Sequence, residues 1–225
     1  DESRSKRQFL QWMGACSLTL ASRGIFAAEN ESDVPGVIVE GSRDVQIALE
    51  RNSDPVVNNL QRRTFRFFWN TAHRTTALIP DRYPTPSFAS IAAVGFALTA
   101  YVIGAERGFV SRSQARIRTL RTLRVLASLP QGPEEKGTAG YKGFYYHFLE
   151  MDTGHRFDTS ELSTVDTALL LGGVLLAQTY FDRDTRQERE IRQLADRIYH
   201  RVDWQWAQAR PPAISHGWRP ETGFL

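Results

Sequence analysis

Cysteine, methionine and lysine are all scarce in this sequence. Of its 225 residues, one is cysteine and two are methionine. The single thiol, Cys16, excludes an intramolecular disulfide and any metal site built from several cysteines. Lys6, Lys136 and Lys142 are the only lysines, so arginine carries nearly all of the positive charge. There is no glycine-rich phosphate loop and no nucleophile elbow, and the histidines lack metal-ligand spacing, so we expect no metal and no cofactor.

A large excess of one charge is missing as well, because the formal net charge is only +3. Hydrophobic residues make up 41% of the chain and charged residues 24%, which is typical of a soluble globular protein. The densest basic run, residues 112–124, contains no acid. A solvated helix face explains that run better than a phosphate-binding surface does, and we expect no nucleic-acid partner.

The N-terminal residues are typical of an export signal. Residues 6–10 read Lys-Arg-Gln-Phe-Leu and resemble the twin-arginine motif, with lysine in place of the first arginine. An apolar stretch follows, too short to span a bilayer, and Ala27-Ala28 offers a cleavage site. We predict an export signal over residues 1–28, a linker over 29–54, and a periplasmic or secreted protein whose precursor uses the twin-arginine or general export machinery. The alternative is a disordered or helical tail.

Five segments have helical patterning, and two kinds of helix alternate along the chain. Residues 55–72, 111–129 and 185–202 combine an apolar stripe with charged positions, as helices with one face in water do. Residues 87–105 and 167–181 carry no charge, which indicates helices buried on all sides. Glycine and hydroxyl residues interrupt both, so we expect burial inside protein and no stable membrane span. In the first segment Asp54 is the expected N-cap, and the expected apolar stripe is Val56, Val57, Leu60, Phe67 and Phe68.

This order of outer and inner helices predicts an all-α fold, an α/α barrel built from helical hairpins. Small residues allow its inner helices to pack closely: Ala92, Ala93, Gly95, Ala97, Gly172 and Gly173. The outer-to-inner connections are long, at about residues 73–86, 130–162 and 203 onward, and in such a barrel they emerge at one end. Functional sites are commonly built from such loops. We expect a small β-hairpin in the second loop, turned at Asp152-Thr153-Gly154.

Aromatic and acidic residues are concentrated in these loops. Glycoside hydrolysis needs two carboxyl groups beside the bond, roughly 6.5–9.5 Å apart for inversion, and an aromatic pocket keeps one of them protonated. Glu161 and Glu221 fit this requirement, and Asp158 is placed to orient Glu161 or tune its proton affinity. The alternative for each is a surface acid or a salt bridge to a nearby arginine. Asp166 fits best as a partner in N-terminal helix capping.

Further side chains in the loops are candidates for binding sugar hydroxyls and ring faces. Asp81 and Arg82 either pair with each other or bind such hydroxyls. The full set of predicted substrate-binding residues is Asp81, Arg82, Lys142, Tyr146, His147, His216 and Trp218.

Several stretches together resemble the bacterial glucoamylase-like domain family, which includes endo-β-1,2-glucanases and a domain of cyclic β-1,2-glucan synthases. They are LQRRTFRFFW, PDRYPTPSFASIAAVGFALTAYVIGAERG, SELSTVDTALLLGG and SHGWRPETGF, within a match from about Leu60 to Leu225. The resemblance implies an (α/α)₆ barrel that hydrolyses β-glucan with inversion, with Glu161 or Glu221 as general acid. Family domains are much longer, so we expect residues 55–225 to be the N-terminal part of the barrel and the chain to be a truncated fragment.

Two other functions remain open on this fold. One is an α-helical scaffold or sugar-binding protein that has lost catalysis. The other is a sugar epimerase or polysaccharide lyase, since fold does not fix function. An epimerase favours a histidine pair and a lyase favours a lysine or tyrosine base, whereas acids dominate these loops. The leading hypothesis is therefore an oligo- or polysaccharide hydrolase.

Overall fold

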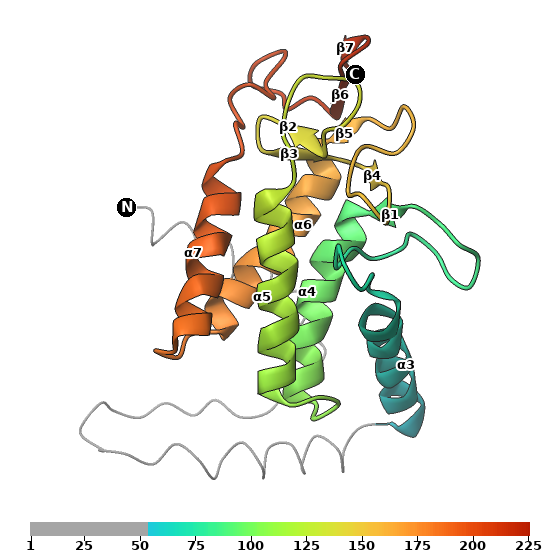
Figure 1. Cartoon of the computed structure of the whole chain (residues 1–225), viewed down its shortest axis with the longest axis vertical. Helices are drawn as coiled ribbons and strands as arrows, with labels where there is room; N and C mark the ends of the chain where they lie inside the picture. Colours follow the sequence, from blue (N-terminus) through green and yellow to red (C-terminus); the bar gives the residue numbers. More distant parts are fainter. Residues whose placement is uncertain (1–53) are drawn as a thin grey trace. The chain divides into compact units, whose positions relative to one another are not determined.

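The computed structural model describes residues 54–225 (Figure 1). Within that range it contains five helices and seven short strands. The predicted export signal (1–28) and the predicted linker (29–54, apart from Asp54) lie outside the described residues. None of the helices between residues 54 and 225 is both long and apolar enough to cross a membrane.

The five predicted helices are all present, with ends within a few residues of those expected. Each begins after a polar N-cap whose side-chain oxygen accepts a backbone N–H of the first turn, as Asp54 does from Val56 at 2.7 Å. Ser90 fills this role before the second helix, which starts four residues later than the sequence predicts because residues 89–90 form a strand. The helices are α3 (Pro55–Thr71), α4 (Ile91–Glu106), α5 (Arg112–Ser128), α6 (Thr164–Tyr180) and α7 (Arg186–His200).

The two predominantly apolar helices, α4 and α6, pack directly against each other. Gly95 and Gly173 make this close approach possible. A Cβ atom on Gly173 would lie 2.1 Å from the carbonyl oxygen of Gly95, and one on Gly95 would lie 2.5 Å from that of Leu169. Because real Cβ contacts are never this short, only glycine fits at these two positions, as the small-residue pattern predicts.

The amphipathic helices flank this inner pair. α3 packs on α4, while α5 and α7 pack on each other and on α4 and α6 respectively. In α7 the predicted stripe is buried, with Ile191 and Ile198 fully covered. The predicted stripe of α3 is correct only in part. Phe67 and Phe68 are half-buried and pack against the core, whereas Val56, Val57 and Leu60 are exposed. The buried residue of this helix is Phe65. Phe65 occupies the space beside Gly104 of α4, so this helix contacts α4 through another face.

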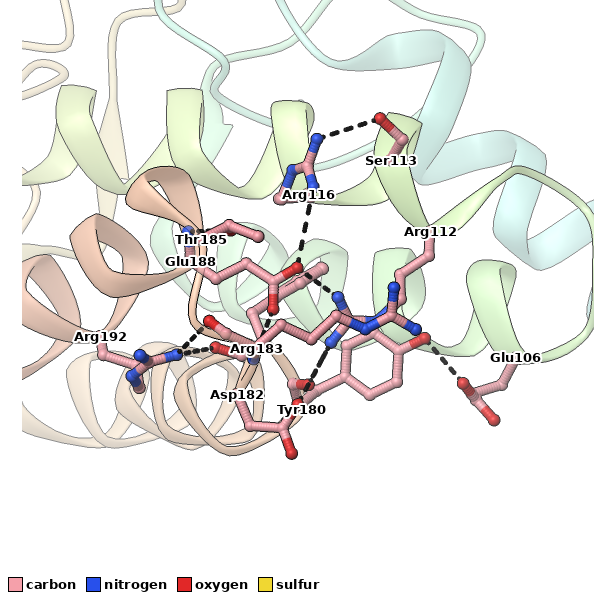
Figure 2. A network of polar contacts seen from close by, with 11 residues as sticks. Glu106, Arg112, Ser113, Arg116, Tyr180, Asp182, Arg183, Thr185, Glu188 and Arg192 are labelled. Carbon is pink, nitrogen blue, oxygen red and sulfur yellow. Dashed lines mark hydrogen bonds and ion pairs between the residues drawn. The ribbon is translucent and has the colours of Figure 1, made fainter. Parts of the chain in front are cut away.

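A buried polar network joins α5 to α7 (Figure 2). The Glu188 side chain is fully buried and forms ion pairs with Arg112 and, at 3.8 Å, with Arg116. Its other oxygen accepts the backbone N–H of Arg183 at 2.9 Å. Thr185 caps α7 by accepting the N–H of Glu188 at 3.2 Å. Both carboxylate oxygens of this buried acid therefore have partners.

The connections contain more β-structure than the single hairpin that the sequence predicts, and the all-α expectation is corrected on this point. The expected turn is present, with Gly154 N–H donating to Glu150 O at 2.9 Å. The loops also pair with one another, because backbone groups that are buried over the helix ends need hydrogen-bond partners. β1 (Ala89–Ser90) pairs with β4 (Phe148–Leu149); the second sheet has the order β2 (Gly140–Tyr141), β3 (Phe144–Tyr146), β5 (Leu162–Ser163), β6 (Gly217–Arg219), β7 (Gly223–Phe224).

One part of the inner pair is not covered. Four large apolar side chains of α4 and α6 are 41–51% exposed: Phe96, Ile103, Val165 and Leu169. A closed barrel is not seen in residues 54–225.

Candidate active site

The predicted site residues gather where the strands meet the inner helices. β1 leads directly into α4 and β5 leads directly into α6, so both sheets lie at the N-terminal end of that pair (Figure 1). β5 and β6 are antiparallel neighbours, with Leu162 opposite Trp218. Glu161 therefore precedes one strand while Glu221 follows the other, at the same end of the helical array. The expectation that distant loops converge at one end is confirmed for these two acids.

Glu161 lies in a cluster of polar side chains with His147. The Nδ1 atom of His147 is 2.9 Å from Glu161 Oε1, and its Nε2 atom is 3.7 Å from Asp166 Oδ1. One imidazole thus lies near two carboxylates that are five residues apart, one just before β5 and one in the first turn of α6. Arg219 Nη2 lies 3.9 Å from the other oxygen of Glu161. Ser163, the N-cap of α6, donates its hydroxyl to Asp166 and accepts that residue's N–H at 3.1 Å.

The pKa of Glu161 is lowered by this surrounding. Burial alone raises it, since a carboxylate loses hydration. A hydrogen bond from its own backbone, the hydrogen bond from His147 and the positive charges of His147 and Arg219 outweigh burial. The Glu161 side chain keeps 19% of its surface exposed, so solvent or a ligand can reach it.

Glu221 is held by a buried arginine. Arg156 donates from Nη1 to Glu221 Oε1 at 2.6 Å and from Nη2 to Oε2 at 3.1 Å. The Arg156 side chain is only 1% exposed, and its Nε also donates to Ser160 O at 2.7 Å. Its guanidinium lies 4.7 Å from the centre of the Tyr146 ring. A two-point contact of this kind fixes the orientation of the carboxylate as well as its charge.

The pKa of Glu221 is accordingly lowered, chiefly by the hydrogen bond from Arg156 and further by the charges of Arg156 and Arg219. The alternative that the sequence leaves open, a salt bridge to a nearby arginine, is what the structure shows. Neither Glu161 nor Glu221 has the raised pKa that we expect of a general acid near neutral pH. Both are carboxylates in the absence of a ligand.

The other predicted residues lie in the loops in varied environments. Asp158 is exposed and has a positive φ of 48°, which is uncommon for a residue other than glycine. Asp81 pairs with Arg82 at 3.4 Å, and Lys142 lies 3.5 Å from an oxygen of Asp203. The carbonyl oxygen of His216, itself an exposed residue, accepts the hydroxyl of Thr164 at 3.0 Å.

Two predicted aromatic contacts differ in their exposure. Trp218 is half-buried on β6, and its ring packs 5.2 Å from Tyr141 and 5.7 Å from Trp206. Tyr146 is fully buried beneath Arg156, and burial raises the pKa of its hydroxyl. The expected contact between Tyr146 and a ligand is corrected, since a fully buried ring supports the site from below.

Sequence reasoning missed two features of the site. Arg156 is the buried partner of Glu221, yet arginine is so frequent in this chain that nothing marked this one. Asp166 does join the start of α6 as predicted, but it also faces His147. The sequence did contain a signal for this contact with His147. Glu161 and Asp166 lie on either side of Ser163, the N-cap of α6, so both acids are placed at the start of that helix. In residues 54–225 no group of three or more acids, histidines or cysteines is arranged to hold a metal ion.

Comparison with known proteins gives one curated relative. It is an exo β-1,2-glucooligosaccharide sophorohydrolase (non-reducing end) from Parabacteroides distasonis, 25% identical over 180 residues. These residues are 76% of this chain and 24% of that protein, so the chain spans about a quarter of the curated relative it matches. No protein-family profile matches the chain.

Solved structures give the same result. A candidate glucoamylase from Bacteroides caccae is 27% identical with a TM-score of 0.63, and a β-1,2-glucanase from Parabacteroides distasonis is 25% identical with a TM-score of 0.65. The matched part is 74% of this chain in both cases, and it covers 41% of the first structure and 24% of the second. The resemblance to glucoamylase-like and β-1,2-glucan-degrading glycoside hydrolases is therefore confirmed.

Proposed function

We propose that this chain is part of a glycoside hydrolase that cleaves β-glucan, with β-1,2-linked glucan as the substrate. The observation that carries the proposal is that Glu161 and Glu221 flank the paired strands β5 and β6 at the N-terminal end of the inner helices. Each has its own cationic or imidazole partner. Two of the similar proteins, the sophorohydrolase and the β-1,2-glucanase from Parabacteroides distasonis, are named for β-1,2-linked glucans, which supports the choice of substrate.

The two carboxyl groups have different environments, and we assign their roles from that difference. Glu221 is paired at two points with Arg156, so it stays a carboxylate and serves as the base that activates water. The pKa of Glu161 already has burial as its largest single influence. A glucan lying over Glu161 removes more water and so raises that pKa from its lowered value. Glu161 then serves as the acid that protonates the leaving oxygen, and the outcome is inversion.

His147 and Asp166 complete this assignment. The imidazole contacts Glu161 through one nitrogen and faces Asp166 through the other. His147 thereby orients the acid, and Asp166 orients His147. The helix cap at Ser163 holds Asp166 in place, so the start of α6 supports the catalytic cluster directly.

The test is the release of reducing ends from linear β-1,2-glucan. Glu161→Gln and Glu221→Gln are expected to lower kcat by about 10²–10⁴-fold, the usual contribution of a positioned acid or base. Glu190→Gln is the matched control, because Glu190 is an acid in an ion pair on the surface of α7. Full activity in both site variants would refute the carboxylate assignment.

Two further features belong to this proposal. We propose that α3–α7 form part of an (α/α)₆ barrel in which further helices cover the exposed side chains of α4 and α6. The partial coverage of the similar structures supports this. We also propose export to the periplasm or the exterior through the twin-arginine-like residues 6–10. Fusing residues 1–28 to a reporter and locating the reporter in cell fractions tests the second point.

A second candidate function is sugar binding without cleavage. The observation in its favour is that the chain matches only a fraction of each similar enzyme. Binding of β-1,2-gluco-oligosaccharide with no release of reducing ends, by any form of the protein, would favour this function over hydrolysis.

A further inference from the structure

A hollow of about 660 Å³ lies beside the catalytic cluster, between residues 82–88 and residues 150–157. Its volume is in the range of small-ligand sites in proteins. Its lining is Arg82, Thr85, Pro86, Ser87, Phe88, Glu150, Met151, Asp152, Thr153 and Phe157. Only Arg82 among them is in the set of substrate-binding residues predicted from the sequence.

A continuous row of rings connects this hollow to Glu161. His147, which contacts Glu161, stacks on Phe148 with ring centres 3.8 Å apart. Phe148 packs 4.2 Å from Phe88, and Phe88 packs 4.6 Å from Phe157. Phe157 is 37% exposed, so part of its ring faces solvent at the end of the row. The row of packed rings thus joins the lining of the hollow to the side chain that contacts Glu161.

Both walls of the hollow are held in shape by backbone hydrogen bonds. In one wall Asp81 N–H donates to Phe88 O at 2.9 Å, which closes the loop at its base. In the other, Phe157 N–H donates to Phe148 O at 3.0 Å and Glu150 N–H donates to His155 O at 2.8 Å. Little ordering is needed on binding, which favours affinity for a small ligand.

The polar groups of the hollow suit a neutral ligand that carries hydroxyl groups. Glu150 accepts the Thr153 hydroxyl at 2.7 Å, and Asp152 lies 3.2 Å from His73 Nε2, so both carboxylates are oriented. Arg82 is the cation among the lining residues and also contacts the face of Phe88. Two acids and one arginine disfavour phosphate or uronate, whereas hydroxyl groups can donate to the acids and accept from the arginine. Phe157 supplies the apolar face that a sugar ring needs.

We infer that this hollow is a distal subsite that binds a glucosyl unit of the substrate remote from the cleaved bond, with Phe157 as its principal contact. This rests on the proposed function, because it takes the ligand to be a glucan. It adds a binding site to that function and predicts a preference for longer chains.

The test is isothermal titration of the full chain carrying Glu161→Gln, which prevents cleavage, with a short and a long β-1,2-gluco-oligosaccharide. Phe157→Ala is expected to weaken binding of the long ligand about tenfold, since contact with an aromatic face contributes on that order. Binding of the short ligand stays unchanged. Phe157→Leu, which keeps apolar volume but no ring face, is expected to behave like Phe157→Ala, and Phe157→Tyr is expected to restore wild-type affinity. Equal melting temperatures confirm intact folding.

The outcomes separate the two proposals. An unchanged affinity of Phe157→Ala for the long ligand, or an equal loss for both ligands, overturns the subsite while glucan binding itself stands. The absence of binding of either ligand to any form overturns the proposed function. Tight binding of the long ligand by Phe157→Leu overturns the role of the aromatic face.

Discussion

Removing the buried charge of Glu188 is the sharpest test of how the outer helices are joined. The side chain is fully buried between α5 and α7, where its carboxylate pairs with Arg112 and lies 3.8 Å from Arg116 (Figure 2). In Glu188→Gln the volume is kept, but the negative charge between two guanidinium groups is lost. The two cations, one turn apart on α5, then lose the carboxylate that α7 places between them, and Arg112 keeps only the exposed Asp182 as an acidic partner, at 3.5 Å.

The cost follows from the environment of the arginines. Breaking a buried ion pair by removing one partner costs about 3–5 kcal/mol. Arg112 and Arg116 keep 21% and 23% of their side-chain surface in solvent, and Arg112 retains a hydrogen bond to Tyr180 O at 2.9 Å. We therefore expect the lower end, about 3 kcal/mol. For a domain of this size that corresponds to a fall in Tm of roughly 6–12 °C.

Thermal unfolding followed by far-ultraviolet circular dichroism measures this effect. The matched control is Glu190→Gln, because Glu190 joins the same two helices through Arg124 at 2.6 Å but on the surface. An exposed pair contributes about 0–1 kcal/mol, so the control changes Tm by a few degrees at most. If Glu188→Gln and Glu190→Gln shift Tm equally, the reasoning from burial is refuted.

Three shorter predictions follow from other contacts. Because the pKa of Glu221 is lowered in the folded state, its pair with Arg156 stabilises the fold above the ordinary glutamate pKa, and this stabilisation is lost as pH falls through the folded-state pKa. The difference in Tm between wild type and Glu221→Gln should therefore shrink in acid. A difference in Tm that does not change with pH would contradict this prediction. Gly173→Ala should lower Tm markedly, because its Cβ would lie 2.1 Å from Gly95 O; an unchanged Tm would show that the helices can separate freely. Leu169→Gln should reduce self-association of the 225-residue chain in analytical ultracentrifugation, since Leu169 is 41% exposed on α6. Unaltered sedimentation would show that this apolar face does not mediate self-association.

The helices could be predicted from the sequence because their physical causes are local. The lack of charge in residues 91–105 and 167–180 predicts that α4 and α6 are inner helices, and Gly95 and Gly173 mark the place where they touch. The expected burial on all sides is not seen, because one face of the pair is exposed. The stripe of α3 could not be predicted from pattern alone, since its apolar residues occupy more than one face. The choice of Phe65 as the buried contact depends on the gap that Gly104 leaves in another helix.

Most of the β-strands were not predicted from the sequence. β2, β4, β5 and β7 are two residues long, too short for an alternating pattern to appear in the sequence. They form because the loops cross the same end of the helices and must satisfy their backbone groups there. The turn at residues 152–154 was predictable, since its glycine adopts a positive φ of 72°, a conformation that glycine favours.

In the candidate site, the acidic residues could be predicted from the sequence, but the partners that surround them could not. Glu161 and Glu221 were recognisable as acids in loops, but their charge states depend on Arg156 and His147, and no spacing in the sequence pairs Arg156 with Glu221. Arg156 is buried, and its two-point contact leaves Glu221 little freedom. We therefore assign the change of protonation during the proposed reaction to Glu161, whose hydration a bound ligand can change. The Glu161 side chain is 19% exposed, so under the proposed function a bound glucan is expected to alter the hydration of Glu161 and to leave the Arg156–Glu221 pair in place. The different roles that we propose for the two carboxyl groups rest on their partners, because the Glu221 side chain, although 31% exposed, is held at two points by Arg156, whereas Glu161 is not.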